Sequence, residues 1–143
     1  MAAGQGRDFT VVAFGGNTQD GTRASYFTPF AKEKGIRVLE ESWDGGIGVI
    51  QSRVQAGTPN LDVVEVEAEE LALGCFEGLY EQIDWSKIGN QDDFLPQAVS
   101  PCGVVTFVWS TALAYDGDAL AEGPASWADF WDVERFPGQG GLR

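Results

Sequence analysis

Short apolar runs alternate with stretches of helical periodicity along the first half of the chain. Residues 9–14, Phe-Thr-Val-Val-Ala-Phe, form a nearly all-apolar run that ends at a pair of glycines. A run of this kind is typical of a strand that is buried on both faces of a sheet. Residues 36–41 and 61–66 predict a second and a third strand.

The segments between these runs predict helices. The first is expected from about Thr22, and its inner side would carry Tyr26, Phe27, Phe30 and Ala31. Pro29 lies inside it and predicts a kink or a restart, because proline lacks the backbone N–H that a helix needs. Gly35 is placed to end this helix in a left-handed conformation.

The spacing of aliphatic residues predicts two more helices. The second carries Ile47, Ile50 and Val54 at helical spacing and stops near Gly57, and a short third helix runs through Leu71 and Leu73. Strands that alternate with helices over short connections imply right-handed crossovers and a parallel sheet. The fold class is therefore α/β, with a doubly wound parallel sheet.

The second half of the chain is patterned more loosely. Helix starts are expected near residues 84–87 and 91–94, and residues 103–114 form a long extended run that offers a strand edge for pairing. Ser126-Trp127-Ala128-Asp129 fits a capping box that opens a helix carrying Trp127, Phe130 and Trp131.

Charge and composition limit the kinds of partner. The chain carries 22 acidic and 9 basic residues, a net charge of −13, which disfavours nucleic acid and anionic membrane surfaces. An apolar share of 43% is too high for a disordered acidic tail. The chain lacks histidine, so Ser–His and Cys–His nucleophilic pairs are impossible and an enzyme is disfavoured. We expect no cofactor and no metal. Residues 1–8 have no apolar stretch, so we do not expect them to form a signal peptide as they stand.

Three loops follow the predicted strands at the edge where open parallel sheets bind ligands. The first contains Gly16, Asn17 and Thr18, which suit either a ligand loop or a tight turn that caps a helix. It resembles a phosphate loop only faintly, because it lacks the lysine and the full glycine spacing.

The second and third loops carry aromatic and acidic residues. Trp43 stands beside Asp44, and this pair could hold a cation or simply pack with a helix cap. Glu67 follows the third strand and is a candidate ligand-binding residue. Glu69 and Glu70 are expected on a solvated face. Glu65 is the odd residue, because a covered strand face should not hold an unpaired carboxylate.

The order of these segments resembles a known family. The matching segments are residues 12–16, 26–30, 34–38, 62–64, 77–79, 83–87, 108–111, 113–116 and 124–132. They resemble the solute-binding proteins of bacterial ABC importers, and within them the spermidine/putrescine-binding branch. The first loop departs from that branch, since Gly15-Gly16 stands where polyamine binders often carry an aromatic residue.

The resemblance implies a type II periplasmic-binding-protein clamp, in which two lobes enclose the ligand. Residues 1–112 would be the N-terminal ligand-binding lobe, and residues 113–143 the hinge crossing and the truncated start of the second lobe. The resemblance also adds Trp109, Ser110 and Thr111, at the hinge, to the ligand-binding candidates. The even number of cysteines, together with the export that the resemblance implies, favours a disulfide between Cys75 and Cys102. The alternative is two buried thiols.

The resemblance thus implies a periplasmic or extracellular receptor for a small cationic solute such as a polyamine. Its partners would be the membrane subunits of an ABC importer. One alternative is the same clamp for another ligand, such as an amino acid derivative or a ferric complex. A second alternative is an isolated lobe that self-associates as a homodimer through apolar residues of its last third.

Overall fold

The computed structural model describes residues 8–138 and residue 141. These residues form two compact units, of which the first ends at Val105 and the second begins at Thr106. The expectation that no signal peptide opens the chain concerns residues 1–7, which lie outside the described residues. No helix in the described part is long and apolar enough to cross a membrane.

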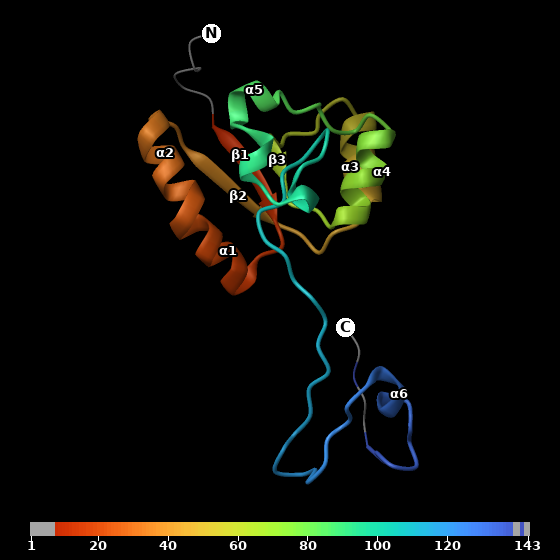
Figure 1. Ribbon diagram of the computed structural model, residues 1–143. Coiled ribbons are helices and arrows are strands. Elements are labelled where there is room, and N and C mark those ends of the chain that lie inside the picture. The colour runs from red at the N-terminus through yellow and green to blue at the C-terminus, as the bar shows by residue number, and fades with distance from the viewer. Residues whose placement is uncertain (1–7, 139–140, 142–143) are drawn as a thin grey trace. The chain divides into compact units, whose positions relative to one another are not determined.

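The first unit is built on a three-stranded parallel sheet. The strands are β1 (Phe9–Ala13), β2 (Val38–Ser42) and β3 (Val63–Val64), and their spatial order is β2-β1-β3. Val11 lies opposite Glu40 on one side and Val63 on the other. β1 is therefore the central strand, and its Val11, Val12 and Ala13 are buried, as the apolar run predicted. Helices lie on both sides of the sheet, which confirms the doubly wound α/β fold (Figure 1).

The first helix starts earlier than the sequence predicted. It comprises α1 (Gly16–Thr22), a π-helical segment η1 (Arg23–Phe27) and α2 (Thr28–Lys34), so the expected start at Thr22 is wrong by six residues. Gly15, with φ of 78°, precedes the helix in a conformation that favours glycine. The polar residues that looked like a loop therefore form the first turn of the helix.

The interruption expected at Pro29 takes the form of the π-helical segment directly before it. A proline ring clashes with the carbonyl four residues earlier in a regular α-helix, and the wider π turn relieves that clash. The helix then ends at Gly35 in the left-handed conformation, with φ of 64°, as predicted. The expected inner position of Tyr26 is wrong, because 57% of Tyr26 is exposed. Phe30 is also partly exposed, but its ring packs against that of Phe9.

The other helices of the first unit follow the predicted order. α3 spans Ile47–Gln55 and buries Ile50, and α4 spans Ala68–Phe76. Beyond them lie α5 (Trp85–Ile88) and two 3₁₀ turns, η2 (Gln91–Asp93) and η3 (Pro96–Ala98). Cys75 and Cys102 form the expected disulfide, which ties the end of α4 to the segment after η3.

Two predicted strands are shorter than expected. The third is confined to Val63–Val64, and its flanking residues Asp62 and Glu65 donate their backbone N–H groups to Thr10 O and Val12 O of β1. The extended run at 103–114 is not a sheet strand, because its one strand-like pairing in the described part is an isolated antiparallel bridge from Val104 to Val99. An extended segment without a neighbouring strand has no ladder to join.

The second unit contains one short helix in its described residues, α6 (Trp127–Phe130). Ser126 caps it, and the Asp129 carboxylate accepts the N–H of Ser126 in return. The predicted capping box is confirmed. The rings of Trp127, Phe130 and Trp131 then pack edge to face on one another.

Candidate functional site

The carboxyl ends of the three strands meet at one edge of the sheet, where Phe14, Trp43 and Glu65 follow β1, β2 and β3. The Trp43 indole N–H donates to the backbone carbonyl of Glu65 at 3.1 Å. The Phe14 backbone N–H donates to the Glu65 carboxylate at 3.3 Å. Glu65 therefore connects the ends of the two other strands.

Phe14 and Trp43 form the aromatic part of this edge. Their ring centroids lie 6.0 Å apart with an interplanar angle of 27°, which is a stacked arrangement. Trp43 is half-buried, and its one side-chain donor is already used on Glu65. Trp43 thus packs against a neighbouring ring, as one of the two alternatives predicted. Its polar contact is with the backbone carbonyl of Glu65, and the adjacent Asp44 is exposed.

A second acidic residue connects the loops after β2 and β3. The Glu70 carboxylate accepts the Gly46 N–H at 2.6 Å and the Glu67 N–H at 3.2 Å. Glu67 precedes the first turn of α4 and forms a reciprocal capping box with Glu70. The expectation of a merely solvated Glu70 is wrong, because its carboxylate satisfies two backbone donors that a loop and a helix start leave unpaired. Glu69 is exposed, as expected.

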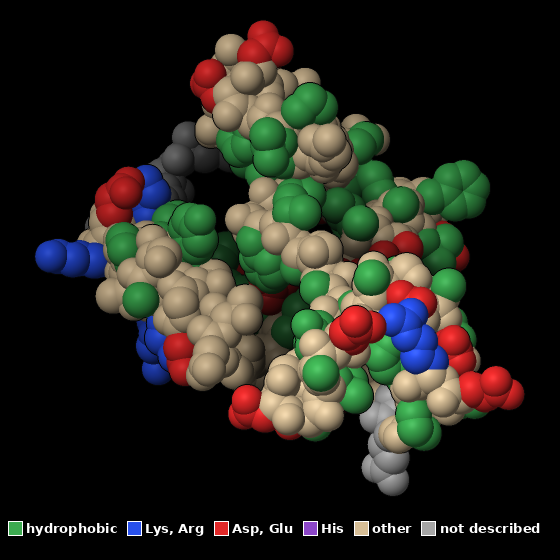
Figure 2. Space-filling model, turned by 60° about the horizontal axis from the view of Figure 1, so that its bottom comes forward, with side chains coloured by type: hydrophobic (Ala, Val, Ile, Leu, Met, Phe, Trp, Pro, Cys, Tyr) green, Lys and Arg blue, Asp and Glu red, His purple; other side chains and the backbone are tan. Residues whose placement is uncertain are grey.

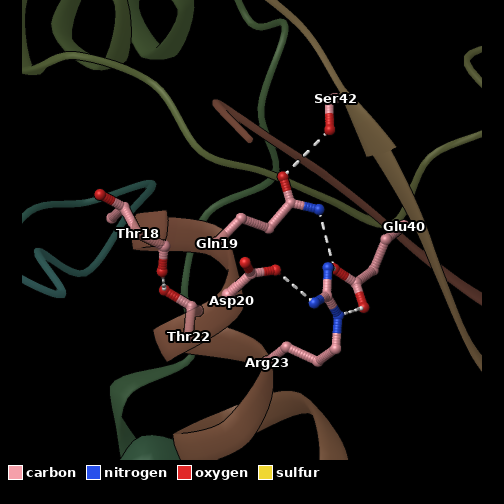
Figure 3. A network of polar contacts seen from close by, with 7 residues as sticks. All are labelled: Thr18, Gln19, Asp20, Thr22, Arg23, Glu40 and Ser42. Atoms are coloured by element: carbon pink, nitrogen blue, oxygen red, sulfur yellow. Dashed lines mark hydrogen bonds and ion pairs between the residues drawn. The ribbon is translucent and has the colours of Figure 1, made fainter. Parts of the chain in front are cut away.

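The predicted first loop lies at the start of α1. Gly16, Asn17 and Thr18 are exposed there, and the Thr18 carbonyl accepts the Thr22 hydroxyl. The next residue, Gln19, is 4% exposed. Its amide accepts the Ser42 hydroxyl at 3.2 Å and donates to Glu40 at 2.8 Å, which joins α1 to β2 (Figure 3).

An ion pair extends this network. The Arg23 guanidinium binds both carboxylate oxygens of Glu40, at 2.6 and 2.9 Å, and also binds Asp20 (Figure 3). Hydrogen bonding to Arg23 lowers the pKa of Glu40. Hydrogen bonding to Glu40 and Asp20 raises the pKa of Arg23. The network is structural: it fixes the helix start against the sheet edge.

The other arginines of the described part are also paired with carboxylates. Arg37 binds Asp8, Arg53 binds Glu41, and Arg135 lies near Glu122 and Asp129. On the face drawn in Figure 2, several basic side chains lie directly beside acidic ones. The arginines in the described part of the first unit are thus paired with this chain's own acids. The acidic edge of the sheet retains its negative character.

The predicted hinge residues belong to the second unit. Trp109, Ser110 and Thr111 lie in an extended segment after Thr106 and are exposed. The structure therefore brings together Trp43, Glu67 and the start of α1 within the first unit, whereas the hinge residues lie in the other unit. Among the described residues, no group of three or more Asp, Glu or Cys side chains could hold a metal ion.

Residues 25–143 match the family of bacterial extracellular solute-binding proteins. The chain belongs to this family. The chain is 44% identical over 142 residues to the gamma-aminobutyric acid-binding protein of Pseudomonas aeruginosa strain PAO1. It is 30% identical over 115 residues to the putrescine-binding periplasmic protein SpuD of P. aeruginosa strain UCBPP-PA14. The two matches cover 99% and 73% of this chain, but only 40% and 31% of the relatives.

A solved structure gives the same result for the fold. The Atu4243 GABA receptor superposes with a TM-score of 0.82 at 32% identity, over 93% of this chain and 41% of that protein. The chain thus spans about 40% of the length of the gamma-aminobutyric acid-binding protein, and its α/β fold is that of the periplasmic binding proteins. The proteins that it resembles are solute-binding proteins of ABC transporters rather than enzymes.

Two residues of this edge lacked an assigned role in the sequence prediction. The pattern did single out Glu65 as an odd carboxylate, but its contacts with Phe14 and Trp43 come from two other strands and leave no local signal. Glu70 did carry a signal. It follows Glu67 by three residues, which is the spacing of a capping box.

Proposed function

We propose that this chain is the ligand-binding N-terminal lobe of a periplasmic or extracellular receptor that delivers a small solute with a cationic amino group to an ABC importer. Residues 1–112 would supply the lobe, and residues 113–143 the hinge crossing and the start of the second lobe. The membrane subunits of the importer are the partners of the complete receptor. Membership of the solute-binding family supports this proposal.

The observation that carries the choice of ligand is the acidic and aromatic edge of the sheet. The Trp43 indole donates to Glu65, and Glu70 joins the loop after β2 to the capping box with Glu67. The arginines described in the first unit are paired elsewhere. Such an edge favours a cation over an anion. On the first lobe, the proposed contacts come from Gly16, Asn17, Thr18, Trp43 and Glu67. At the hinge, they would come from Trp109, Ser110 and Thr111.

The ligand has two candidate classes, and they share one chemical group. Polyamines such as putrescine and spermidine carry only ammonium groups. Omega-amino acids such as gamma-aminobutyric acid carry one ammonium and one carboxylate. The relative named for gamma-aminobutyric acid is 44% identical, and the one named for putrescine is 30% identical. The amino acid derivative is therefore as well supported as the polyamine, and the shared ammonium group is what the first unit would bind.

A titration followed by ¹H–¹⁵N NMR tests the proposal, because it detects the weak binding expected of one lobe. The ligands are putrescine, spermidine and gamma-aminobutyric acid, with butyrate as the control that lacks an ammonium group. The expected result is that the amines move the signals of residues 14–18, 43–46 and 65–70, and that butyrate does not. If none of the amines moves these signals at millimolar concentration, the proposal is wrong.

A further inference from the structure

Glu65 is held in place from three directions at the carboxyl end of the sheet. Its backbone N–H donates to Val12 O at 2.8 Å, and its backbone carbonyl accepts the Trp43 indole. One carboxylate oxygen accepts the Phe14 N–H at 3.3 Å. A side chain fixed through its own backbone and through two neighbouring strand ends is preorganised, so binding to it would cost little ordering entropy.

The charge of Glu65 has no cationic partner in the described part of the chain. The arginines that could have neutralised it bind Glu40, Glu41 and Asp8 instead. A carboxylate that is half-buried between two strand ends and accepts one long hydrogen bond keeps acceptor capacity to spare. A cation bound there would compensate a charge that the fold leaves uncompensated.

The surroundings of this carboxylate favour an organic cation. The Phe14 backbone N–H and the Trp43 indole N–H both donate hydrogen bonds to Glu65. The rings of Phe14 and Trp43 stack on each other. An alkylammonium gains from the carboxylate through a charge-assisted hydrogen bond, and its carbon chain gains from contact with the ring faces. A metal ion is disfavoured, because the described residues include no cluster of three acidic or thiol ligands.

We propose that Glu65 binds the ammonium group of the ligand, with Phe14 and Trp43 as the aromatic wall along its alkyl chain. This inference rests on the proposed function and makes it more specific. It assigns the ammonium end of the ligand to Glu65, a residue outside the set inferred from sequence. It also identifies Glu65, in place of the neighbouring Asp44, as the carboxylate that acts together with Trp43.

The test compares Glu65→Gln with Asp44→Asn. Both variants remove one negative charge from a residue that is adjacent to Trp43 or hydrogen-bonded to it, but only the first removes the carboxylate that accepts the Phe14 backbone N–H. The probes are n-butylamine and putrescine, titrated against the whole chain, and the Trp43 indole N–H signal reports the site. We expect Glu65→Gln to weaken both amines at least tenfold and Asp44→Asn to change their affinity less than twofold.

A second measurement does not depend on the folding of a variant. It titrates the unmodified chain with n-butylamine and with 1-butanol, two molecules that have nearly the same shape and differ in charge. The amine should shift the Trp43 indole signal at concentrations where the alcohol leaves it in place. If amine and alcohol shift the Trp43 indole signal equally, the site recognises only the shape of the ligand and not its charge. That result would overturn the role of Glu65.

The outcomes separate this inference from the proposed function. If the unmodified chain binds amines and folded Glu65→Gln binds them equally well, Glu65 is not the ammonium site, whereas the amine receptor stands. Equal weakening by both variants would mean that only overall charge matters, and it would also overturn the inference. If the unmodified chain binds no amine, both proposals are wrong together.

Discussion

The ring of Tyr80 packs directly on the backbone of Gly74 in α4. A β-carbon added at Gly74 would lie 2.2 Å from Cε2 of Tyr80, far inside van der Waals contact. Burial, together with the nearby charge of Glu70, raises the pKa of the Tyr80 hydroxyl. The tyrosine thus packs against α4, whose residues Gly74 and Glu70 are both its neighbours.

This contact predicts a large effect of Gly74→Ala. Overpacking of this kind costs roughly 1–3 kcal/mol or more, since a ring next to backbone cannot simply move aside. Urea denaturation followed by fluorescence measures the free energy of unfolding. Gly48→Ala in α3 is the matched control, because nothing lies within 4 Å of its added carbon. The control should be neutral or stabilising by up to about 1 kcal/mol. Equal effects of the two substitutions would contradict the packing argument.

Reduction of the Cys75–Cys102 disulfide should destabilise the first unit. The two cysteines are 27 residues apart, and in the chain-entropy model a loop of this length contributes roughly 3–4 kcal/mol. Unfolding midpoints in urea, measured with and without reductant, give the difference. A Cys75→Ala/Cys102→Ala variant, which reductant should not affect, controls for other effects of the reductant. Two free thiols titrating in the denatured, unreduced protein would refute the bond itself.

The Arg23–Glu40 pair predicts a pH-dependent effect of Glu40→Gln. Because the folded state lowers the pKa of Glu40, the carboxylate contributes stability above its unfolded pKa and loses it as the pH falls through the folded value. The variant should be less stable than the unmodified chain by about 1 kcal/mol at neutral pH, a modest figure since Arg23 is partly exposed. This difference should shrink below pH ~4.

The control for this prediction is Glu33→Gln. Glu33 pairs with the adjacent Lys34 at the surface, and its side chain is 70% exposed. Removing it should change the stability little at any pH. A stability difference for Glu40→Gln that does not vary between neutral pH and about pH 3 would rule out the ion pair as its cause.

Glu67→Gln should weaken binding of a diamine about tenfold, which corresponds to ~1.4 kcal/mol. The proposed charge-assisted hydrogen bond to the ligand would be lost, while the glutamine side chain retains an oxygen that can serve the capping box of α4. The change in affinity is measured by the same NMR titration. Glu69→Gln, an exposed neighbour on the same helix, is the control. An unchanged affinity in folded Glu67→Gln would remove Glu67 from the site.

The second unit predicts self-association of the chain. Trp131 and Val133 are 66% and 70% exposed, and Val108 and Trp109 are exposed as well. Apolar surface of this kind tends to find another surface. Size exclusion with light scattering should give a dimer at micromolar concentration. The double substitution Trp131→Ser/Val133→Ser should shift it towards the monomer. A clean monomer for the unmodified chain would show that this expectation is wrong.

The sequence pattern was most informative where burial is uniform. β1 is apolar on both faces because helices cover both sides of the sheet, and its run of apolar residues was sufficient to place it. The helix end at Gly35 was also predictable, because the left-handed conformation strongly selects glycine.

The pattern was uninformative where a polar residue is buried by distant partners. Asn17, Thr18 and Gln19 have the composition of a loop, yet they begin α1. Gln19 is buried because Ser42 and Glu40, more than 20 residues away, satisfy its amide. The contacts of Glu65 could not be predicted for the same reason, because its partners Phe14 and Trp43 follow two other strands.

The π-helical segment before Pro29 separates the first helix into two stretches of different register. A π turn holds one more residue than an α turn, so side chains after it are rotated by about 100° from where an unbroken helix would place them. One helical wheel drawn through both stretches therefore assigns the wrong faces, as the exposure of Tyr26 illustrates. A homologue with one residue fewer at this point and no proline could form a regular α-helix with the same inward-facing residues. Length differences of a single residue are thus expected to be tolerated here.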